Sequence, residues 1–138
     1  MKILLVDDEP LILQSIGKFL IEFGYEVVYA RDGVEALSLL DQQNHPGLII
    51  SDIRMPRIDG LEFLRLARLR APEVPVLLMT GFGDENIAIE AFHKGACDYM
   101  KKPVKLRELL TCIERVEKQQ QLESEMMGEM NLKSERLH

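Results

Sequence analysis

Asp52 is the residue whose type and position most clearly suggest chemistry. It ends the apolar run Leu48-Ile49-Ile50-Ser51, and the following Pro56 and Gly60 indicate a loop. A carboxylate in such a position can act as a nucleophile toward a phosphoryl group. A single aspartate at the end of a strand is more often a turn former, so the functional interpretation depends on polar residues elsewhere in the chain.

Other apolar runs also end in polar residues, and these are Asp7, Asp8, Thr80 and Lys102. If the runs are parallel strands, their carboxyl ends meet at one edge of a sheet and the side chains converge on one crevice. Two carboxylates ~4 Å apart repel by roughly 4 kcal/mol at an effective dielectric of ~20. A cation would offset this repulsion, and an all-oxygen ligand set is typical of Mg²⁺. Thr80 could then donate to one phosphoryl oxygen while Lys102 neutralises another.

Strand-like and helix-like segments alternate along the chain. The expected strands are 3–6, 26–30, 48–52, 76–79 and 97–101. The expected helices are 10–23, 34–40, 61–71, 87–95 and 105 onward. Alternation of this kind predicts a parallel sheet with helices on both faces, joined by right-handed crossovers.

Composition narrows the function classes. The chain has 138 residues, about one domain, and a net charge of -6 that argues against a nucleic-acid surface. No apolar stretch approaches the ~20 residues that span a bilayer, so we expect no membrane segment and a cytoplasmic protein. Cys97 and Cys112 lack metal-ligand spacing, and we expect two reduced, mostly buried thiols.

A set of short motifs accompanies these residues: Asp7-Asp8 after the first run, Asp52 with Met55-Pro56 and Gly60, Met79-Thr80-Gly81, Gly95-Ala96, Asp98-Tyr99 and Lys102-Pro103. Together they resemble the response-regulator receiver domains of two-component signal transduction. The resemblance runs from Met1 to about Glu117. It implies an α/β fold with a doubly wound five-stranded parallel sheet of flavodoxin-like order 2-1-3-4-5, here with an extended C-terminal helix.

The resemblance also implies roles for individual residues. Asp52 would be the phosphoacceptor for a sensor histidine kinase. Mg²⁺, or Mn²⁺ in its place, would be held by Asp8, Asp52 and the backbone carbonyl of Arg54. Asp7 would act on the metal mainly through water.

A switch is implied as well. Thr80 and Lys102 would assist the phosphoryl chemistry, and Thr80 with Tyr99 would form the switch pair. Phosphorylation would then change the surface of helix 4, strand 5 and helix 5, and so control an output domain or protein, as in a phosphorelay. On this interpretation the chain is no enzyme, although it assists its own phosphorylation and dephosphorylation.

Two other functions use a similar set of residues. A phosphohydrolase of the haloacid-dehalogenase-like kind also combines an aspartate nucleophile, a threonine, a lysine and an acidic pair. In that group the nucleophile lies in an Asp-x-Asp motif, and the acidic pair comes last in the sequence. Here the residue two positions after Asp52 is Arg54, and the acidic pair Asp7-Asp8 comes first. A flavin-binding module would need a phosphate-binding loop after the first strand, where Asp7-Asp8-Glu9 would repel phosphate.

The C-terminal segment differs from the rest of the chain. We expect a receiver domain over 1–118 and a helical extension or linker over 119–138 that frays past Gly128. The seam-like positions Leu106, Leu109, Ile113 and Val116 are followed by Gln120 and Glu123, and apolar residues resume at Leu122, Met126 and Met130. Two interpretations stay open: the core face of a helix that then frays, or a coiled coil in a homodimer. A homodimer through helix 4, strand 5 and helix 5 is the other dimer considered.

Overall fold

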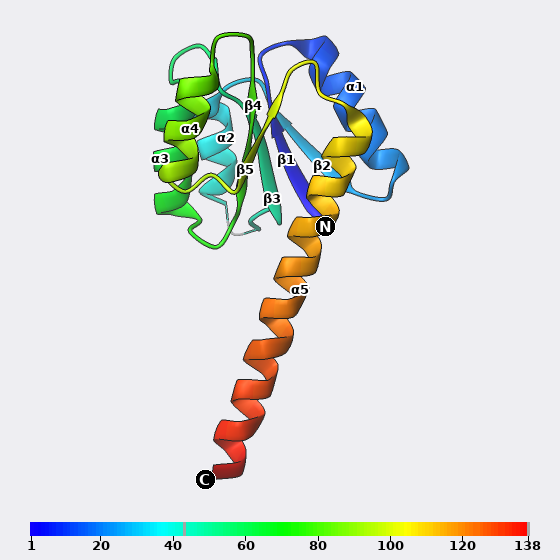
Figure 1. Ribbon diagram of the computed structural model, residues 1–138, viewed down its shortest axis with the longest axis vertical. Helices are drawn as coiled ribbons and strands as arrows, with labels where there is room; N and C mark the ends of the chain where they lie inside the picture. Colours follow the sequence, from blue (N-terminus) through cyan, green and yellow to red (C-terminus); the bar gives the residue numbers. More distant parts are fainter. Residues whose placement is uncertain (43, 138) are drawn as a thin grey trace. The chain divides into compact units, whose positions relative to one another are not determined.

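The computed structural model describes residues 1–42 and 44–137, and it contains one parallel sheet with intervening helices (Figure 1). The strands are β1 Lys2–Val6, β2 Glu26–Ala30, β3 Leu48–Asp52, β4 Val76–Thr80 and β5 Asp98–Lys101. The helices are α1 Pro10–Glu22, α2 Gly33–Leu40, α3 Gly60–Arg70, α4 Glu85–His93 and α5 Leu106–Leu137. All neighbouring strands pair in parallel in the order β2-β1-β3-β4-β5, which confirms the predicted fold.

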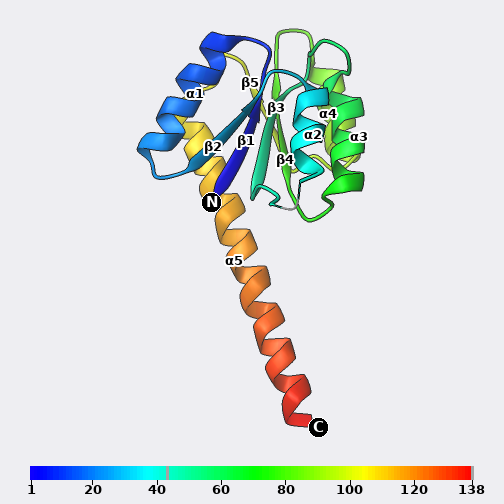
Figure 2. The ribbon, with the colours of Figure 1, turned by 180° about the vertical axis from the view of Figure 1, so that it is seen from behind.

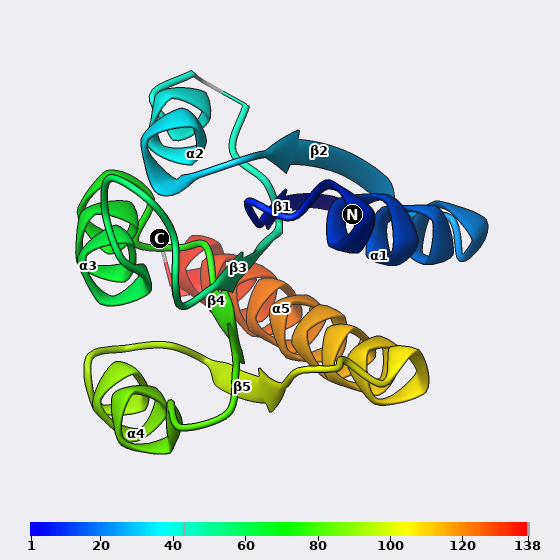
Figure 3. The ribbon, with the colours of Figure 1, turned by 90° about the horizontal axis from the view of Figure 1, so that it is seen from above.

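Helices cover both faces of the sheet. Helix α1 lies against one face, and α2, α3 and α4 lie against the other, as the view from behind and the view from above also show (Figures 2 and 3). Every residue of β3 and of β4 is buried. Strands covered on both faces have no solvent side, which explains why their sequences are continuous apolar runs instead of alternating ones.

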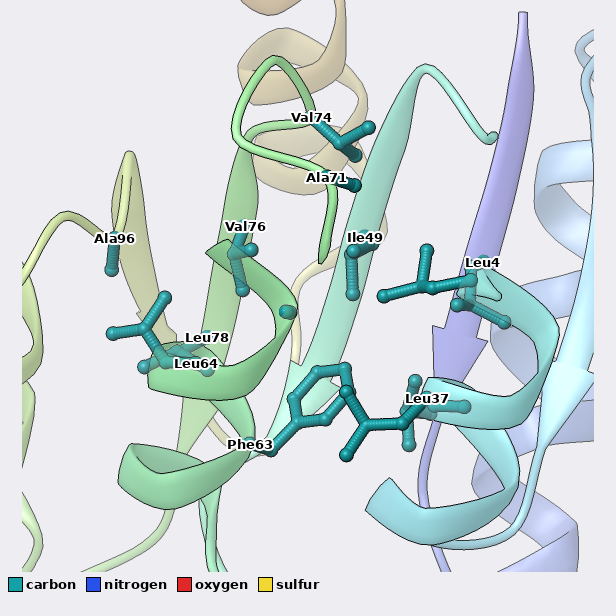
Figure 4. Close-up of a cluster of buried hydrophobic side chains, with 14 of the residues drawn as sticks. Leu4, Leu37, Ile49, Phe63, Leu64, Ala71, Val74, Val76, Leu78 and Ala96 are labelled. Atoms are coloured by element: carbon teal, nitrogen blue, oxygen red, sulfur yellow. The ribbon is translucent and has the colours of Figure 1, made fainter. Parts of the chain in front are cut away.

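One hydrophobic core lies under α2 and α3. Leu4 of β1, Ile49 of β3, Leu37 of α2 and Phe63 of α3 meet there, each with less than a tenth of its surface exposed (Figure 4). Since successive side chains of a strand point to opposite faces, Ile3, Leu5, Leu48 and Ile50 belong to the other face, where they are fully buried. The central strands are therefore fixed by apolar contacts on two sides.

Local capping sets where α3 begins. The side chain of Asp59 accepts a hydrogen bond from the backbone N–H of Glu62 at 2.9 Å, and a cap of this kind contributes about 1 kcal/mol. The next residue, Gly60, packs against backbone: an added Cβ would lie 2.6 Å from Cα of Ile53. Its amide donates to the carbonyl oxygen of Ile53 at 2.8 Å. This close approach folds the loop after β3 back onto the strand.

The strand register brings the polar ends level. Val6 pairs with Ser51, so the next residues, Asp7 and Asp52, stand side by side. Thr80 pairs with Lys101, and the backbone N–H of Lys102 donates to the carbonyl oxygen of Thr80 at 2.7 Å. One edge of the sheet therefore collects the residues that the sequence singled out.

Helix α5 forms a second compact unit from Arg107 onward. Its 32 residues correspond to a rod of about 48 Å. The prediction that the helix frays past Gly128 is wrong, because α5 continues through that glycine to Leu137. Met126 and Met130 are exposed on it. Residue 138, the end of the predicted extension, lies outside the described residues.

Two further expectations concern membrane segments and the two cysteines. Among the described helices, none has the length and apolarity needed to cross a membrane. The expectation that both cysteines are mostly buried is wrong for Cys97, which is exposed just before β5, and right for Cys112. The position before a short edge strand explains the exposure of Cys97, because only one side of such a strand is covered by a neighbour.

Candidate functional site

An acidic cluster lies at the carboxyl ends of β1 and β3. Carboxylate oxygens of Asp7, Asp8 and Asp52 lie within 4.8 Å of one another. Asp7 is fully buried, Asp52 is 6% exposed and Asp8 is exposed. Three carboxylates so close together, one of them open to solvent, fit a hard cation with oxygen ligands. The donor set therefore agrees with the metal site expected from the sequence.

Lys102 reaches into this cluster from the end of β5. Its Nζ lies 2.9 Å from Oδ2 of Asp7 and 3.0 Å from Oδ2 of Asp52. The other oxygen of Asp7 accepts the backbone N–H of Glu9 at 2.9 Å. Lys102 supplies one positive charge for two nearly buried carboxylates, so the cluster with exposed Asp8 keeps a net negative charge.

Burial and charge act in opposite directions on these groups. Burial raises the pKa of the Asp52 carboxyl, and the hydrogen bond and charge of Lys102 offset only part of that rise. For Lys102 burial lowers the pKa, but the hydrogen bonds and charges of Asp7 and Asp52 outweigh it, so the pKa is raised. Lys102 is accordingly an ammonium at neutral pH.

Thr80 ends β4 beside the cluster. It is 2% exposed, and its hydroxyl donates to the carbonyl oxygen of Met100 on β5 at 3.4 Å. Tyr99, the residue before Met100, is 40% exposed. The threonine thus binds the backbone of β5 one residue after Tyr99, while the pairing of the two residues as a switch stays a prediction.

The loop after Asp52 carries Arg54. Its backbone N–H lies 3.4 Å from Oδ1 of Asp52, while its side chain extends to Asp84, with Nε 2.7 Å from Oδ1 of that residue. The structure therefore brings Asp7, Asp8, Asp52 and Lys102 into one cluster, and Thr80 and Arg54 flank it. Tyr99 lies on the neighbouring edge strand instead.

Sequence reasoning missed Asp84. This carboxylate is 1% exposed at the N-cap position of α4, and it accepts both Arg54 and the backbone N–H of Gly81, the latter at 3.1 Å. An aspartate just before a helical segment is a signal for a cap, but nothing in the sequence indicates a partner 30 residues away.

The side chains of the arginines that follow Asp52 are mostly exposed, and several of them pair with acids. Arg65 pairs with Glu62 on its own helix. Arg57 pairs with Asp32 at the start of α2, and Arg70 pairs with Asp41. These long side chains reach acids on other elements.

His45 has a hydrogen-bond partner beside each of its ring nitrogens. Its Nδ1 lies 2.7 Å from Oε1 of Glu73, and its Nε2 lies 2.9 Å from the carbonyl oxygen of Leu40. Acceptors beside both ring nitrogens favour the protonated ring, because only imidazolium can donate from each of them.

Known proteins resemble this chain in both sequence and structure. A family model for the response regulator receiver domain matches residues 3–114. The chain is 40% identical over 114 residues to the response regulator protein FleR of Pseudomonas aeruginosa. It is 39% identical over 109 residues to the response regulator MprA of a Mycobacterium species. The matched segment covers 83% of this chain but 24% of FleR, and 79% of this chain but 47% of MprA, so the chain spans less than half of these relatives.

Solved structures agree. A response regulator receiver domain protein from Clostridium thermocellum superposes with a TM-score of 0.84 at 35% identity, covering 88% of this chain and 97% of that one. NtrX from Brucella abortus gives a TM-score of 0.84 at 33% identity, covering 91% of this chain and 28% of that one. The family model and these relatives give no support to the phosphohydrolase or flavin-binding alternatives.

Proposed function

Because this chain belongs to the family of response regulator receiver domains, we propose that Asp52 is its phosphoacceptor and that a histidine of a sensor kinase supplies the phosphoryl group. The observation that carries the proposal is the position of Lys102, whose Nζ lies 3.0 Å from Asp52 and 2.9 Å from Asp7. A fixed ammonium beside a nucleophilic carboxylate, next to a carboxylate cluster suited to a cation, is a site for phosphoryl chemistry.

The metal is Mg²⁺, for which Mn²⁺ can substitute, held by Asp8, Asp52 and the backbone carbonyl of Arg54. Asp7 acts mainly through water, which agrees with the fact that both of its oxygens already accept hydrogen bonds, one from Lys102 and one from the backbone N–H of Glu9. The exposed Asp8 has its carboxylate open to the ion. When bound, the ion supplies positive charge that reduces repulsion between the carboxylates and the incoming phosphoryl oxygens.

Transfer proceeds by attack of an Asp52 carboxylate oxygen on phosphorus. The O–P bond forms as the N–P bond of the donor phosphohistidine breaks, and the imidazole leaves with the electron pair of that bond. Lys102 exchanges its contact with the Asp52 carboxylate for one with a phosphoryl oxygen. Thr80 turns its hydroxyl from the carbonyl of Met100 to another phosphoryl oxygen, which removes its 3.4 Å bond to β5.

The proposed switch follows from the loss of the hydrogen bond between Thr80 and Met100. The phosphoryl group adds roughly -1.5 to -2 charges and three strong acceptor oxygens, enough to draw the Thr80 hydroxyl inward. The backbone beside Tyr99 then loses a donor from β4, and the partly exposed ring of Tyr99 takes up a new position. The surface of α4 and β5 changes as a result, and this change controls an output domain or a partner protein.

The assignment of Asp52 is tested by phosphorylation with a small acyl-phosphate donor and Mg²⁺. Intact-mass measurement should show one added phosphoryl group that hydroxylamine removes. Asp52→Asn should take up none, whereas Asp41→Asn, which removes an exposed carboxylate on another element, should label as the unmodified chain does. Equal labelling of Asp52→Asn would rule out the assignment.

The same proposal covers domains and assembly. Residues 1–118 form the phosphoacceptor domain, residues 119–138 form a helical extension, and the chain is a phosphoacceptor switch, not an enzyme.

We infer a homodimer through the extension, because the exposed Leu122, Met126 and Met130 give α5 an apolar stripe. A homodimer through α4 and β5 is the alternative.

Sedimentation decides between these dimers. Residues 1–138 and 1–118 are compared, each with and without phosphorylation, at tens of micromolar. A dimer of 1–138 that becomes a monomer in 1–118 supports the extension. Retention of the dimer in 1–118 favours α4 and β5, and a monomer in all four samples contradicts both.

A further inference from the structure

Asp84 is a nearly buried carboxylate that the proposed phosphoryl chemistry does not use. It is 1% exposed, and its two oxygens are divided between two donors. Oδ1 accepts Nε of Arg54 at 2.7 Å, and Oδ2 accepts the backbone N–H of Gly81 at 3.1 Å. The guanidinium is the only charged partner that the described part of the chain gives this carboxylate.

Both donors lie close in sequence to residues of the proposed phosphoryl site. Arg54 lies two residues after Asp52, and its backbone N–H is 3.4 Å from Oδ1 of Asp52. Gly81 directly follows Thr80. The hydrogen bond and charge of Asp84 raise the pKa of the Arg54 guanidinium, and the negative charge of Asp52 raises it further. Arg54 therefore interacts electrostatically with Asp52 while it is bonded to Asp84.

We propose that Asp84 holds, in the unphosphorylated chain, the Arg54 guanidinium that a phosphoryl group on Asp52 would claim, and that Arg54 moves from Asp84 to that group on phosphorylation. This inference rests on the proposed function of Asp52. We call the ion pair of Arg54 and Asp84 a lock, because it holds the loop after β3 to the start of α4. It is separate from the Thr80 and Tyr99 pair.

The competition favours the phosphoryl group. It carries nearly twice the charge of a carboxylate and three acceptor oxygens, and a guanidinium binds such oxygens in a planar, two-pronged manner. The Arg54 side chain is 69% exposed, so little packing opposes its movement. Its backbone is already anchored beside Asp52.

Release of Arg54 has a mechanical consequence. The Arg54 guanidinium shields and neutralises the Asp84 carboxylate, so its departure removes the charged partner and part of the cover together. Asp84 can then turn toward water and exchange the hydrogen bond from the Gly81 N–H for hydration. Its backbone carbonyl accepts the N–H of Ala88 at 2.9 Å in the first turn of α4, so movement of Asp84 loosens that turn.

The same loop provides a matched control. Arg57 pairs with Asp32, whose side chain is 12% exposed and whose Oδ1 accepts the N–H of Glu35 at 2.9 Å at the start of α2. This pair has the same chemistry and joins the same loop to a different helix. Loss of the Arg57 pair should leave α4 unaffected.

The test is amide hydrogen exchange at Gly81 and Ala88 in the full chain, read by NMR, with and without acyl phosphate and Mg²⁺. In the unmodified chain, phosphorylation should speed exchange at both amides by roughly tenfold, the equivalent of one lost charge-assisted hydrogen bond. Asp84→Asn and Arg54→Gln should show this faster exchange without phosphorylation, and phosphorylation should add little. Arg57→Gln should behave as the unmodified chain does.

Mass measurement on the same samples separates the two levels of the proposal. If the unmodified chain takes up no phosphoryl group, both the proposed function and the lock fail. If it is phosphorylated and either Arg54→Gln or Asp84→Asn retains slow exchange at Gly81 and Ala88 before phosphorylation, the lock alone is overturned. Arg54→Gln alters a mostly exposed side chain, so it remains informative if Asp84→Asn does not fold.

Discussion

Replacement of Lys102 by glutamine should destabilise the fold, and the magnitude follows from the carboxylates it separates. Oxygens of Asp7 and Asp52 lie within 4.8 Å of each other. At that distance and an effective dielectric of ~20, two full charges repel by about 3 kcal/mol. Lys102 is bonded to both, and its side chain is only 17% exposed, so solvent would offset little of the loss. We expect the free energy of unfolding to fall by about 3 kcal/mol at neutral pH without Mg²⁺.

Urea denaturation followed by circular dichroism measures this loss. Mg²⁺ should recover more stability in Lys102→Gln than in the unmodified chain, because the ion then supplies the missing charge. The deficit should also shrink as the pH falls. The pKa of Asp52 is already raised by burial, and a carboxyl with a raised folded-state pKa destabilises the fold only above its unfolded-state pKa, an effect that protonation removes.

The control is Lys94→Gln, which breaks an exposed pair with Glu90, 2.9 Å apart, in which both side chains are at least half exposed. Exposed pairs contribute up to about 1 kcal/mol. A loss in Lys102→Gln no larger than in Lys94→Gln, or a loss that does not respond to Mg²⁺, would refute the electrostatic account of the cluster.

Three further predictions concern separate parts of the chain. The hydrogen bond to Glu73 raises the pKa of His45, so its contribution to stability should be complete below the unfolded-state pKa of ~6.5. That contribution should disappear as the pH rises through the higher folded-state pKa. The urea midpoints of His45→Gln and the unmodified chain should therefore converge at high pH. A difference in midpoint that stays constant with pH would contradict this. Gly60→Ala should cost about 1–3 kcal/mol, because the new Cβ would lie 2.6 Å from Cα of Ile53, whereas Gly128→Ala meets nothing within 4 Å and should raise helicity instead. Asp8→Asn should weaken Mg²⁺ binding in calorimetric titration more than Asp7→Asn, since Asp8 is exposed and Asp7 is bonded to Lys102; the reverse order would exclude Asp8 as a direct ligand.

The elements of the fold were predictable because β1, β3 and β4 are marked by short apolar runs and the turns by glycine, proline or aspartate. Parallel strands place their carboxyl ends together. This made it predictable that the polar side chains at those ends converge, namely Asp7, Asp8, Asp52 and Lys102. The continuation of α5 through Gly128 was not predicted: one glycine costs about 1 kcal/mol, which the surrounding good helix formers offset.

Pairs between distant long side chains could not be predicted. Arg54 meets Asp84 across 30 residues, and His45 meets Glu73 across 28. Such pairs depend on how loops project from the sheet, and no spacing in the sequence reports that projection. Apolar periodicity reveals which face of an element is buried, but it carries no information on which acid an exposed arginine selects.

The hydrogen bond between Asp7 and Lys102 joins residues 95 positions apart in the sequence, so the site is complete only when both ends of the sheet-forming sequence have folded. Lys102 directly follows β5, an edge strand of four residues. A chain in which β5 is unfolded or not yet synthesised would present Asp52 without its ammonium neighbour. On the proposed function, acyl-phosphate labelling should therefore be weaker in a molecule that has lost this edge of the sheet.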